Sequence, residues 1–176
     1  MNKIFYYLLL LDLFLILPFT FSFLSYSPAI PMLFHYLILG ISIFLSNKFY
    51  SLSRKFLFIA LPIIIFWHLP WFFDYATSVY FIWIIDVISM TISGVLIGSS
   101  ISKFSINFLV FLFFLWMIGD SLLSYMWIIG FSLYSSPYSI YPRYELPAAG
   151  SIVFVVMDIL GVYILLKLFF AKIFTN

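Results

Sequence analysis

The chain has 176 residues, of which 66% are hydrophobic and only 8% charged, and its mean hydropathy is +1.23. Soluble domains carry about 25% charged residues, so this composition predicts an integral membrane protein with a single transmembrane domain over residues 1–176. The lack of cysteine excludes disulfides, thiolate metal sites and iron–sulfur clusters, and the small net charge of +2 offers no surface for nucleic acid.

Apolar runs follow one another along the chain, separated by short segments rich in Ser, Pro, Lys or Asp. A membrane-spanning helix needs about 20 apolar residues. The first run is longer than the apolar part of a signal peptide and no small-residue cleavage site follows it, so we expect it to remain as a helix. The pattern predicts an all-α bundle of six transmembrane helices at about 4–24, 30–46, 56–75, 79–100, 105–131 and 148–170.

The basic residues predict how the bundle is oriented, because Lys and Arg collect on cytoplasmic loops. With six spans, both termini and the loops after the second and fourth spans share one side. Of the eight basic residues, only Arg143 falls on the other side. The remaining basic residues are Lys3, Lys48, Arg54, Lys55, Lys103, Lys167 and Lys172. We therefore expect a multi-pass protein of the plasma membrane with both termini in the cytoplasm.

Every predicted span contributes an ionisable side chain, and most of these lie in the outer half of the span. A charge at the centre of a bilayer costs about 2.5–3.5 kcal/mol on insertion scales, so such groups are expected to face the bundle interior, to pair or to stay neutral. Their convergence predicts a polar cluster or a water-lined cavity open to the outside. Its members are Asp12, Asp74, Asp120 and Asp158, together with His35, His68 and Asp86.

The last three of these residues suggest a metal site. His35, His68 and Asp86 come from consecutive predicted helices at matched depth, and we expect His68 to face the interior beside the other two. Met32 and Met90 each lie one helical turn from one of these residues, and thioether with imidazole suits copper(I). Haem held between the two histidines is a less favoured cofactor, because aromatic walls occur throughout a chain with 24% aromatic residues.

Two other functions stay open for the polar groups. Transmembrane aspartates also hydrogen-bond across helices as neutral acids and fix packing, as in a structural or interaction subunit. A path through Asp12, Asp158, Asp120 and Asp86 would instead describe a small ion or proton transporter, although the inner half has no further acids. No hydrolytic triad, phosphate-binding loop or nucleotide motif is present, so we do not expect an enzyme.

Two short patterns predict the shape and packing of single helices. "GVLIG", Gly94 to Gly98, has the GxxxG spacing that lets another helix approach closely. Pro62 and Pro70 flank His68 in the third predicted span, and each removes a backbone donor and favours a kink.

Longer stretches carry a resemblance to known proteins. "FHYLILG", "FWHLPWFFDYA" and "LYSSPYSIYP" before a last helix with "MDILG" resemble a small family of membrane proteins from archaeal thermoacidophiles, a domain of unknown function. That resemblance implies a six-span fold and a membrane location.

"WHLPWFFDYA" and the "SLYSSPYSIYP" loop followed by an aspartate are also similar to the CtaG-like family, which is linked to assembly of the copper centre of haem–copper terminal oxidases. This second resemblance implies an accessory protein in the lipid bilayer with respiratory oxidase subunits as partners. The CtaG-like pattern has further histidines in the helix after the "WH" motif. Here that helix reads "VYFIWIIDVISM", with Asp86 in their place, so a metal site would be poorer in nitrogen ligands.

Overall fold

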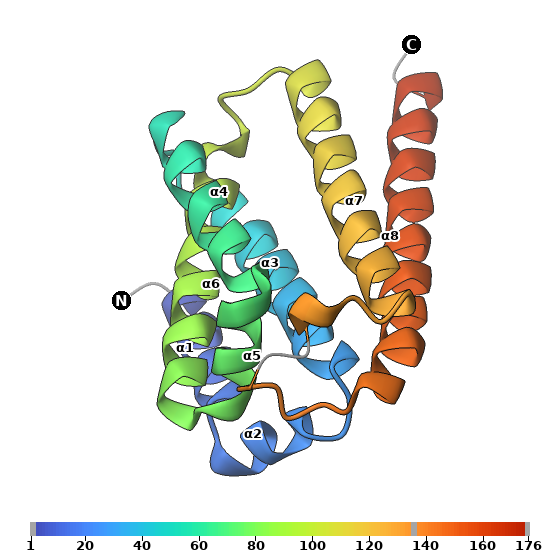
Figure 1. Cartoon of the computed structure of the whole chain (residues 1–176). Coiled ribbons are helices and arrows are strands. Elements are labelled where there is room, and N and C mark those ends of the chain that lie inside the picture. The colour runs from blue at the N-terminus through green and yellow to red at the C-terminus, as the bar shows by residue number, and fades with distance from the viewer. Residues whose placement is uncertain (1–2, 135–136, 175–176) are drawn as a thin grey trace.

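The fold is a bundle of helices (Figure 1). The structure, a computed structural model, describes residues 3–134 and 137–174, with side chains from Tyr6 to Lys167, and within these ranges it contains helices and no strand. The all-α prediction is confirmed. The helices are α1 (Lys3–Leu15), α2 (Pro18–Leu24), α3 (Ala29–Asn47), α4 (Lys55–His68), α5 (Pro70–Ser78), α6 (Tyr80–Ile101), α7 (Ile106–Ile128) and α8 (Leu146–Phe174), with the short 3₁₀ turns η1 (Ser132–Tyr134) and η2 (Arg143–Glu145).

Several of these helices can cross a membrane. In the described part of the chain, α3, α6, α7 and α8 are each long and apolar enough to do so. Two bent pairs, α1 with α2 and α4 with α5, pass the same test when each pair is taken together, which gives four to six candidate spans. The chain is therefore a membrane protein, and the predicted runs 4–24 and 56–75 are each broken helices rather than straight ones.

The first break separates α1 from α2, whose axes differ by 60°. Pro18 begins α2 and has no N–H to continue the hydrogen bonds of α1. Side-chain donors satisfy the carbonyls that the break leaves: Thr20 Oγ1 donates to Phe14 O at 2.7 Å, Trp83 Nε1 to Leu15 O at 3.0 Å and Tyr80 Oη to Ile16 O at 2.5 Å. Two of these donors come from α6, so α6 fixes the position of the break.

The second break lies at Leu69, between α4 and α5, and bends the chain by 72°. Pro70 begins α5, and Leu69 before it is extended, with ψ of 137°, as residues before proline usually are. Pro62, in contrast, lies inside α4 without ending it. The hydroxyl of Tyr134, from the loop after α7, donates to the carbonyl of His68 at 3.1 Å and caps the end of α4.

The central contact of the bundle is between α3 and α6. Gly94 and Gly98 of α6 lie against α3: a Cβ built at Gly94 would be 2.5 Å from Ser42 Cβ, and one at Gly98 would overlap the backbone of Ile43. The core around this pair includes α1, α2, α4 and α5. Its buried residues are Leu15, Leu24, Ile38, Trp67, Ala76, Trp83, Val87 and Met90.

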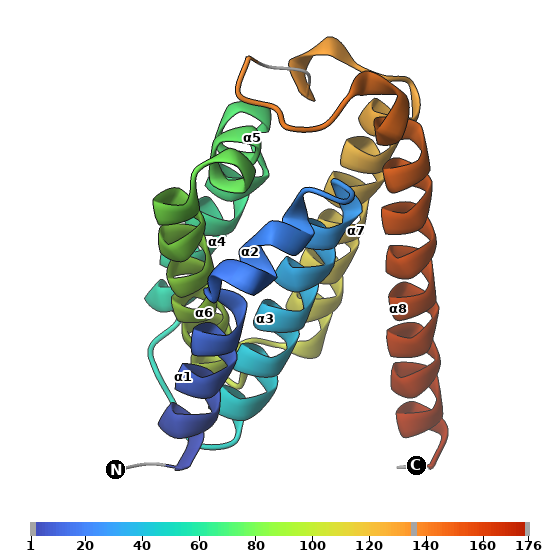
Figure 2. The same ribbon diagram turned by 90° about the horizontal axis from the view of Figure 1, so that it is seen from below.

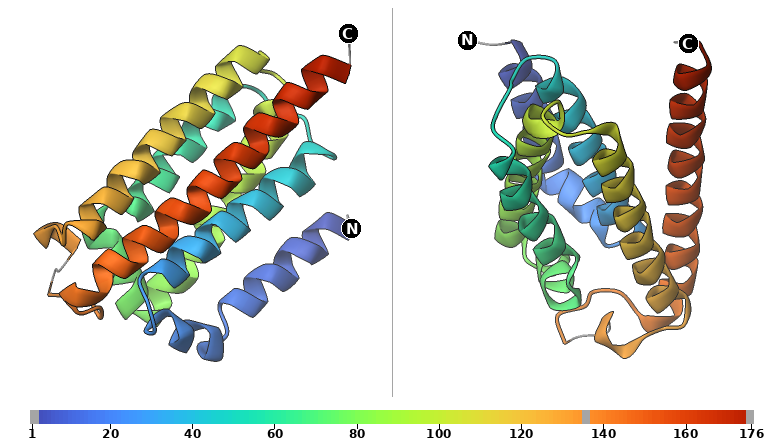
Figure 3. Two further views of the ribbon diagram at one scale, coloured as in Figure 1. Left: turned by 90° about the vertical axis from the view of Figure 1, so that its right-hand side faces the viewer. Right: turned by 90° about the horizontal axis from the view of Figure 1, so that it is seen from above.

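Helices α7 and α8 form a second unit of the bundle. They pack closely on each other, since a Cβ at Gly150 of α8 would be 2.6 Å from the carbonyl of Ser124 of α7. A separate buried cluster joins them to α3 at the end that carries the long loop. Away from that loop α8 diverges from α3, as Figure 2 and Figure 3 (right) show.

The two ends of the bundle differ in charge. Both termini lie at one end (Figure 3), where the exposed basic side chains cap α3, begin α4, follow α6 and lie near the end of α8. These are Lys48, Arg54, Lys55, Lys103 and Lys167. We call this the basic end, and the opposite end, which carries residues 132–145 and Arg143, the loop end.

Candidate functional site

A buried histidine–aspartate pair lies between α3 and α6. The Nε2–H of His35 donates to Oδ2 of Asp86 at 2.8 Å. Each of the two residues is only 1% exposed. The close approach of α3 and α6 at Gly94 and Gly98, two turns or more along α6, holds the two helices in this register.

His68 completes the group from a third direction. It is the last residue of α4, and its Nδ1–H donates to the carbonyl of Ile64 at 2.7 Å. Its ring centroid lies 5.2 Å from that of His35, with the planes tilted by 54°. The indole of Trp83 stacks on His35, with a centroid distance of 6.2 Å and an angle of 16° between the planes. The His35 imidazole thus contacts a second imidazole, an indole and a carboxyl group.

Each histidine of this group uses one ring nitrogen in a hydrogen bond. The other nitrogen of His35, Nδ1, is buried and has no hydrogen-bond partner among the residues that the structure describes, and the same is true of Oδ1 of Asp86. A buried polar atom without a partner costs about 1–3 kcal/mol. The protein thus leaves two buried polar atoms of this group without a hydrogen bond, as expected of a site that accepts a ligand.

The arrangement differs from a three-ligand metal centre. Within residues 3–134 and 137–174, no group of three or more His, Cys, Asp or Glu side chains is placed to hold a metal ion. Asp86, a ligand in the sequence-based prediction, is a hydrogen-bond partner of His35 instead, and only the two imidazoles remain as nitrogen donors. The reason is that Oδ2 of Asp86 faces the ring edge of His35 across the α3–α6 contact.

Asp120 lies next to this group. It is 5% exposed on α7, and its Oδ2 accepts a hydrogen bond from the hydroxyl of Tyr36 at 2.8 Å. Tyr36 follows His35 on α3, and the Asp120 carboxylate interacts electrostatically with His35. The hydrogen bond between Tyr36 and Asp120 thus connects α7 to α3 directly beside His35.

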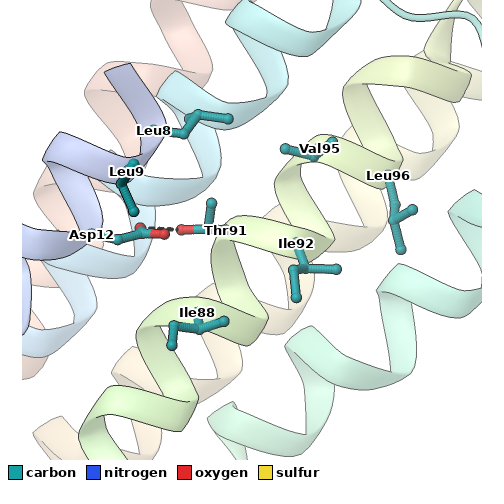
Figure 4. Close-up of a pocket in the computed structure, with 8 residues that line it drawn as sticks. All are labelled: Leu8, Leu9, Asp12, Ile88, Thr91, Ile92, Val95 and Leu96. Carbon is teal, nitrogen blue, oxygen red and sulfur yellow. Dashed lines mark hydrogen bonds between the residues drawn. The ribbon is translucent and has the colours of Figure 1, made fainter. Parts of the chain in front are cut away.

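Asp12 lies elsewhere, in a groove between α1 and α6 (Figure 4). Its Oδ1 accepts a hydrogen bond from the hydroxyl of Thr91 at 2.6 Å. The groove has a volume of about 270 Å³ and is otherwise lined by apolar side chains, such as Leu9 and Ile92. Asp12 therefore joins α1 to α6 and does not reach the histidines.

The remaining two aspartates occupy separate places as well. Asp158 is half-buried on α8 and borders a shallow groove lined by residues of α8 itself. Asp74 is buried on α5 near the loop tyrosines Tyr134 and Tyr141. Burial raises the pKa of both tyrosine hydroxyls, and the negative charge of Asp74 raises the pKa further. Both tyrosines therefore remain hydrogen-bond donors at neutral pH, to the carbonyls of His68 and Leu24 respectively.

Three neighbours of the site are absent from the sequence-based prediction. Tyr36 follows His35 directly, Trp83 lies one helical turn before Asp86, and Trp67 is buried with its indole N–H donating to Ser89 at 2.6 Å. The sequence does place all three close to predicted site residues: Tyr36 and Trp67 are each one residue from a histidine, and Trp83 is three residues before Asp86. This proximity in the sequence is the feature from which they could have been predicted.

The fold and these contacts define an all-helical membrane protein with a buried His35–Asp86 pair near the loop end and the half-buried His68 beside it. The chain belongs to the family described as "Protein of unknown function (DUF1404)", whose model matches residues 6–171. This agrees with the predicted membership of an uncharacterised domain family. No curated protein and no solved structure matches the chain.

Proposed function

We propose that the chain crosses the plasma membrane six times, with both termini in the cytoplasm. Each bent pair then counts as one span, and an even number of spans agrees with two termini at the same end of the bundle. The basic end carries Lys48, Lys103 and Lys167 among its exposed residues, and positive residues favour the cytoplasmic side.

Cysteines introduced at Ser51 and Tyr144 are expected to label from opposite sides of the membrane. Ser51 is exposed at the basic end and Tyr144 is 79% exposed at the loop end. In intact cells a membrane-impermeant maleimide should modify only the cysteine at position 144, and both cysteines after permeabilisation. Equal labelling of the two positions in intact cells would contradict the orientation.

We further propose that His35 and His68 bind a copper ion as cargo, and that the protein serves as an accessory in the assembly of a respiratory terminal oxidase. One observation supports the copper site. In each imidazole one nitrogen donates a hydrogen bond, to Asp86 from His35 and to the Ile64 carbonyl from His68. The two ring centroids lie 5.2 Å apart. Histidines that bind metals almost always donate their other N–H to a carboxylate or a backbone carbonyl.

The spacing and chemistry of the group fit such an ion. With metal–nitrogen bonds of about 2.0 Å, two imidazoles on one ion have centroids roughly 4.5–6.5 Å apart, and the two rings lie within this range. The lone pair of His35 Nδ1 is buried without a partner. Met32 and Met90, one turn from His35 and from Asp86, are fully buried, and thioethers and imidazoles favour copper(I) over harder ions.

The oxidase role rests on the resemblance of "WHLPWFFDYA" and the following loop to the CtaG-like family. A site near the loop end would present the ion on the outer side of the membrane in the proposed orientation. Cells that lack the chain are then expected to assemble a terminal oxidase with less copper, while haem content is retained.

Copper binding can be tested on the purified protein. We expect one Cu(I) per chain after anaerobic loading and desalting, measured by elemental analysis, with nitrogen scattering in the X-ray absorption spectrum. His35→Ala and His68→Ala should each reduce the bound copper at least about tenfold, since the chain has only two histidines. Tyr36→Phe, which changes the residue beside His35 and keeps both rings, is the matched control and should bind as the parent does. Copper retained equally by all three variants would refute the site.

A structural role for the separate aspartates is the second candidate function. Asp12 with Thr91 and Asp120 with Tyr36 each bridge two helices at 2.6 and 2.8 Å. Such hydrogen bonds fix the packing of transmembrane helices without any transport path. If the parent protein binds no copper, this packing role also describes the His35–Asp86 pair.

A further inference from the structure

Helix α8 carries a carboxyl group that the described part of the chain leaves without a partner. Asp158 lies near the middle of α8, half-buried at the edge of a shallow groove. Asp12, Asp86 and Asp120 are each hydrogen-bonded within the chain, to Thr91, His35 and Tyr36 respectively. Asp158 has no such bond to any residue that the structure describes. A carboxyl group without a partner is strongly unfavourable in hydrocarbon, so we expect its partner to come from outside the chain.

The same groove is bordered by a hydroxyl group that also lacks a partner. Tyr163, another of the groove's lining residues, is 61% exposed and forms no hydrogen bond with the described residues. It follows Asp158 by five residues, and such residues are separated by about 140° around a helix axis. The hydroxyl and the carboxyl group therefore lie on either side of a strip of α8 surface and cannot bond each other.

The strip between them is apolar and has the spacing of a helix–helix contact. Its residues follow one another at alternating intervals of three and four, and each is between 46% and 63% exposed: Ile152, Val155, Ile159, Val162 and Leu166. We call this the outer stripe of α8. Met157 and Gly161, on the other side of α8, contact α7. Figure 3 (left) shows α8 across the near side of the bundle, with no other helix in front of it. Alternating intervals of three and four are those of two helices that pack side by side over several turns.

The positions of the two polar groups fit a parallel pair of α8 helices. Asp158 immediately precedes Ile159 of the outer stripe, and Tyr163 immediately follows Val162. In a parallel coiled coil, a side chain at the first of these positions lies beside the one five residues later on the other helix. Two copies of one chain have the same orientation in a membrane, so their α8 helices run parallel. A two-fold axis then forms the contact between Tyr163 and Asp158 twice.

We propose that the outer stripe of α8 binds the outer stripe of a second copy of the chain. In this dimer the Tyr163 hydroxyl of each copy donates to the Asp158 carboxyl group of the other. A transmembrane helix of a different protein is the competing partner. It must supply both a donor and an acceptor at the right positions, whereas a second copy supplies both by symmetry. The dimer contact shares no residue with the proposed copper site.

The apolar part of the contact can be tested by cross-linking, because the chain has no cysteine of its own. Ile159→Cys and Val162→Cys, oxidised with iodine in membranes, should link two copies at least about fivefold more than a cysteine away from the contact. Leu10→Cys, on the surface of α1 at 61% exposure, is the matched control. The product should have twice the mass of the chain. A product of any other mass, or equal yields from the three variants, would overturn the proposal.

The polar part can be tested by energy transfer between labelled copies in liposomes, measured over a range of protein densities. Asp158→Leu and Tyr163→Phe should each weaken the dimer about tenfold, because either change removes both symmetric bonds and each contributes about three- to fivefold. The double variant should be no weaker than either single variant, since it breaks the same bonds. Tyr7→Phe, on α1 at 59% exposure, is the matched control and should leave the dimer unchanged.

These variants should leave the fold of the single chain intact, because neither side chain bonds within the described part of its own chain. The unfolding temperature at low protein density is therefore expected to match that of the parent. A parent protein that stays monomeric at all densities would overturn the proposal. Losses that add in the double variant would mean that Asp158 and Tyr163 do not bond each other, and would overturn the assigned contact.

Discussion

Replacing Gly98 by leucine is expected to destabilise the bundle by at least about 3 kcal/mol, the upper part of the range for overpacked cores. A Cβ at this position would overlap Ser46 Oγ and the Ile43 backbone of α3. Backbone atoms cannot rotate away as a side chain can, so α3 and α6 must move apart. That movement would also pull Asp86 away from His35.

The size of this effect can be judged against two other glycines. Gly94→Leu should destabilise less, because its nearest neighbour is the side chain of Ser42. Gly40→Leu makes the same chemical change at an open position and should alter stability by no more than about 0.5 kcal/mol. The measurement is reversible unfolding in mixed micelles, followed by Trp fluorescence. Equal stability of the variants at positions 98 and 40 would show that α3 and α6 are not in the described contact.

The helical content and the close helix packing at Gly94 and Gly98 are predictable from sequence. The identity of the helix that packs there is not, and the helix breaks are predictable only in part. Hydropathy depends on composition over some twenty residues, so it finds the apolar runs regardless of bends. Proline identity alone does not decide the outcome: Pro70 and Pro18 begin new helices, while Pro62 is accommodated within α4. At Pro18 the break is stabilised by donors from α6, which is distant in the sequence, so no local pattern contains that information.

The candidate site was also predictable from the sequence only in part. Counting residues from the end of a span gives the depth of a side chain, and His35, His68 and Asp86 do lie at a common level. Depth does not give the direction in which a side chain points around the helix axis. Asp12 and Asp158 are therefore included in the predicted polar cluster, although they border grooves at other places on the bundle. The rotation of each helix follows from packing between distant segments.

Replacing Asp86 by leucine is expected to cost about 3 kcal/mol, because it leaves the His35 ring buried with neither nitrogen bonded. Leucine keeps the branching of the aspartate side chain at Cγ and leaves no cavity, but its methyl groups are larger than the carboxylate oxygens, so the loss includes some overpacking beside the lost hydrogen bond. Asp86→Asn keeps a side-chain oxygen that can accept from His35 Nε2, and it should cost no more than about 1 kcal/mol.

A double-mutant cycle separates the pair from its surroundings. His35→Leu with Asp86→Leu removes both polar groups, so the double variant should be more stable than the sum of the single losses predicts, by about 1–3 kcal/mol. Tyr36→Phe combined with Asp86→Leu is the control, because Tyr36 bonds Asp120 and not Asp86, and its losses should add. Strict additivity for His35 and Asp86 would mean that the 2.8 Å contact contributes nothing to stability. A large coupling would instead show that the hydrogen bond between His35 and Asp86 stabilises the contact between α3 and α6.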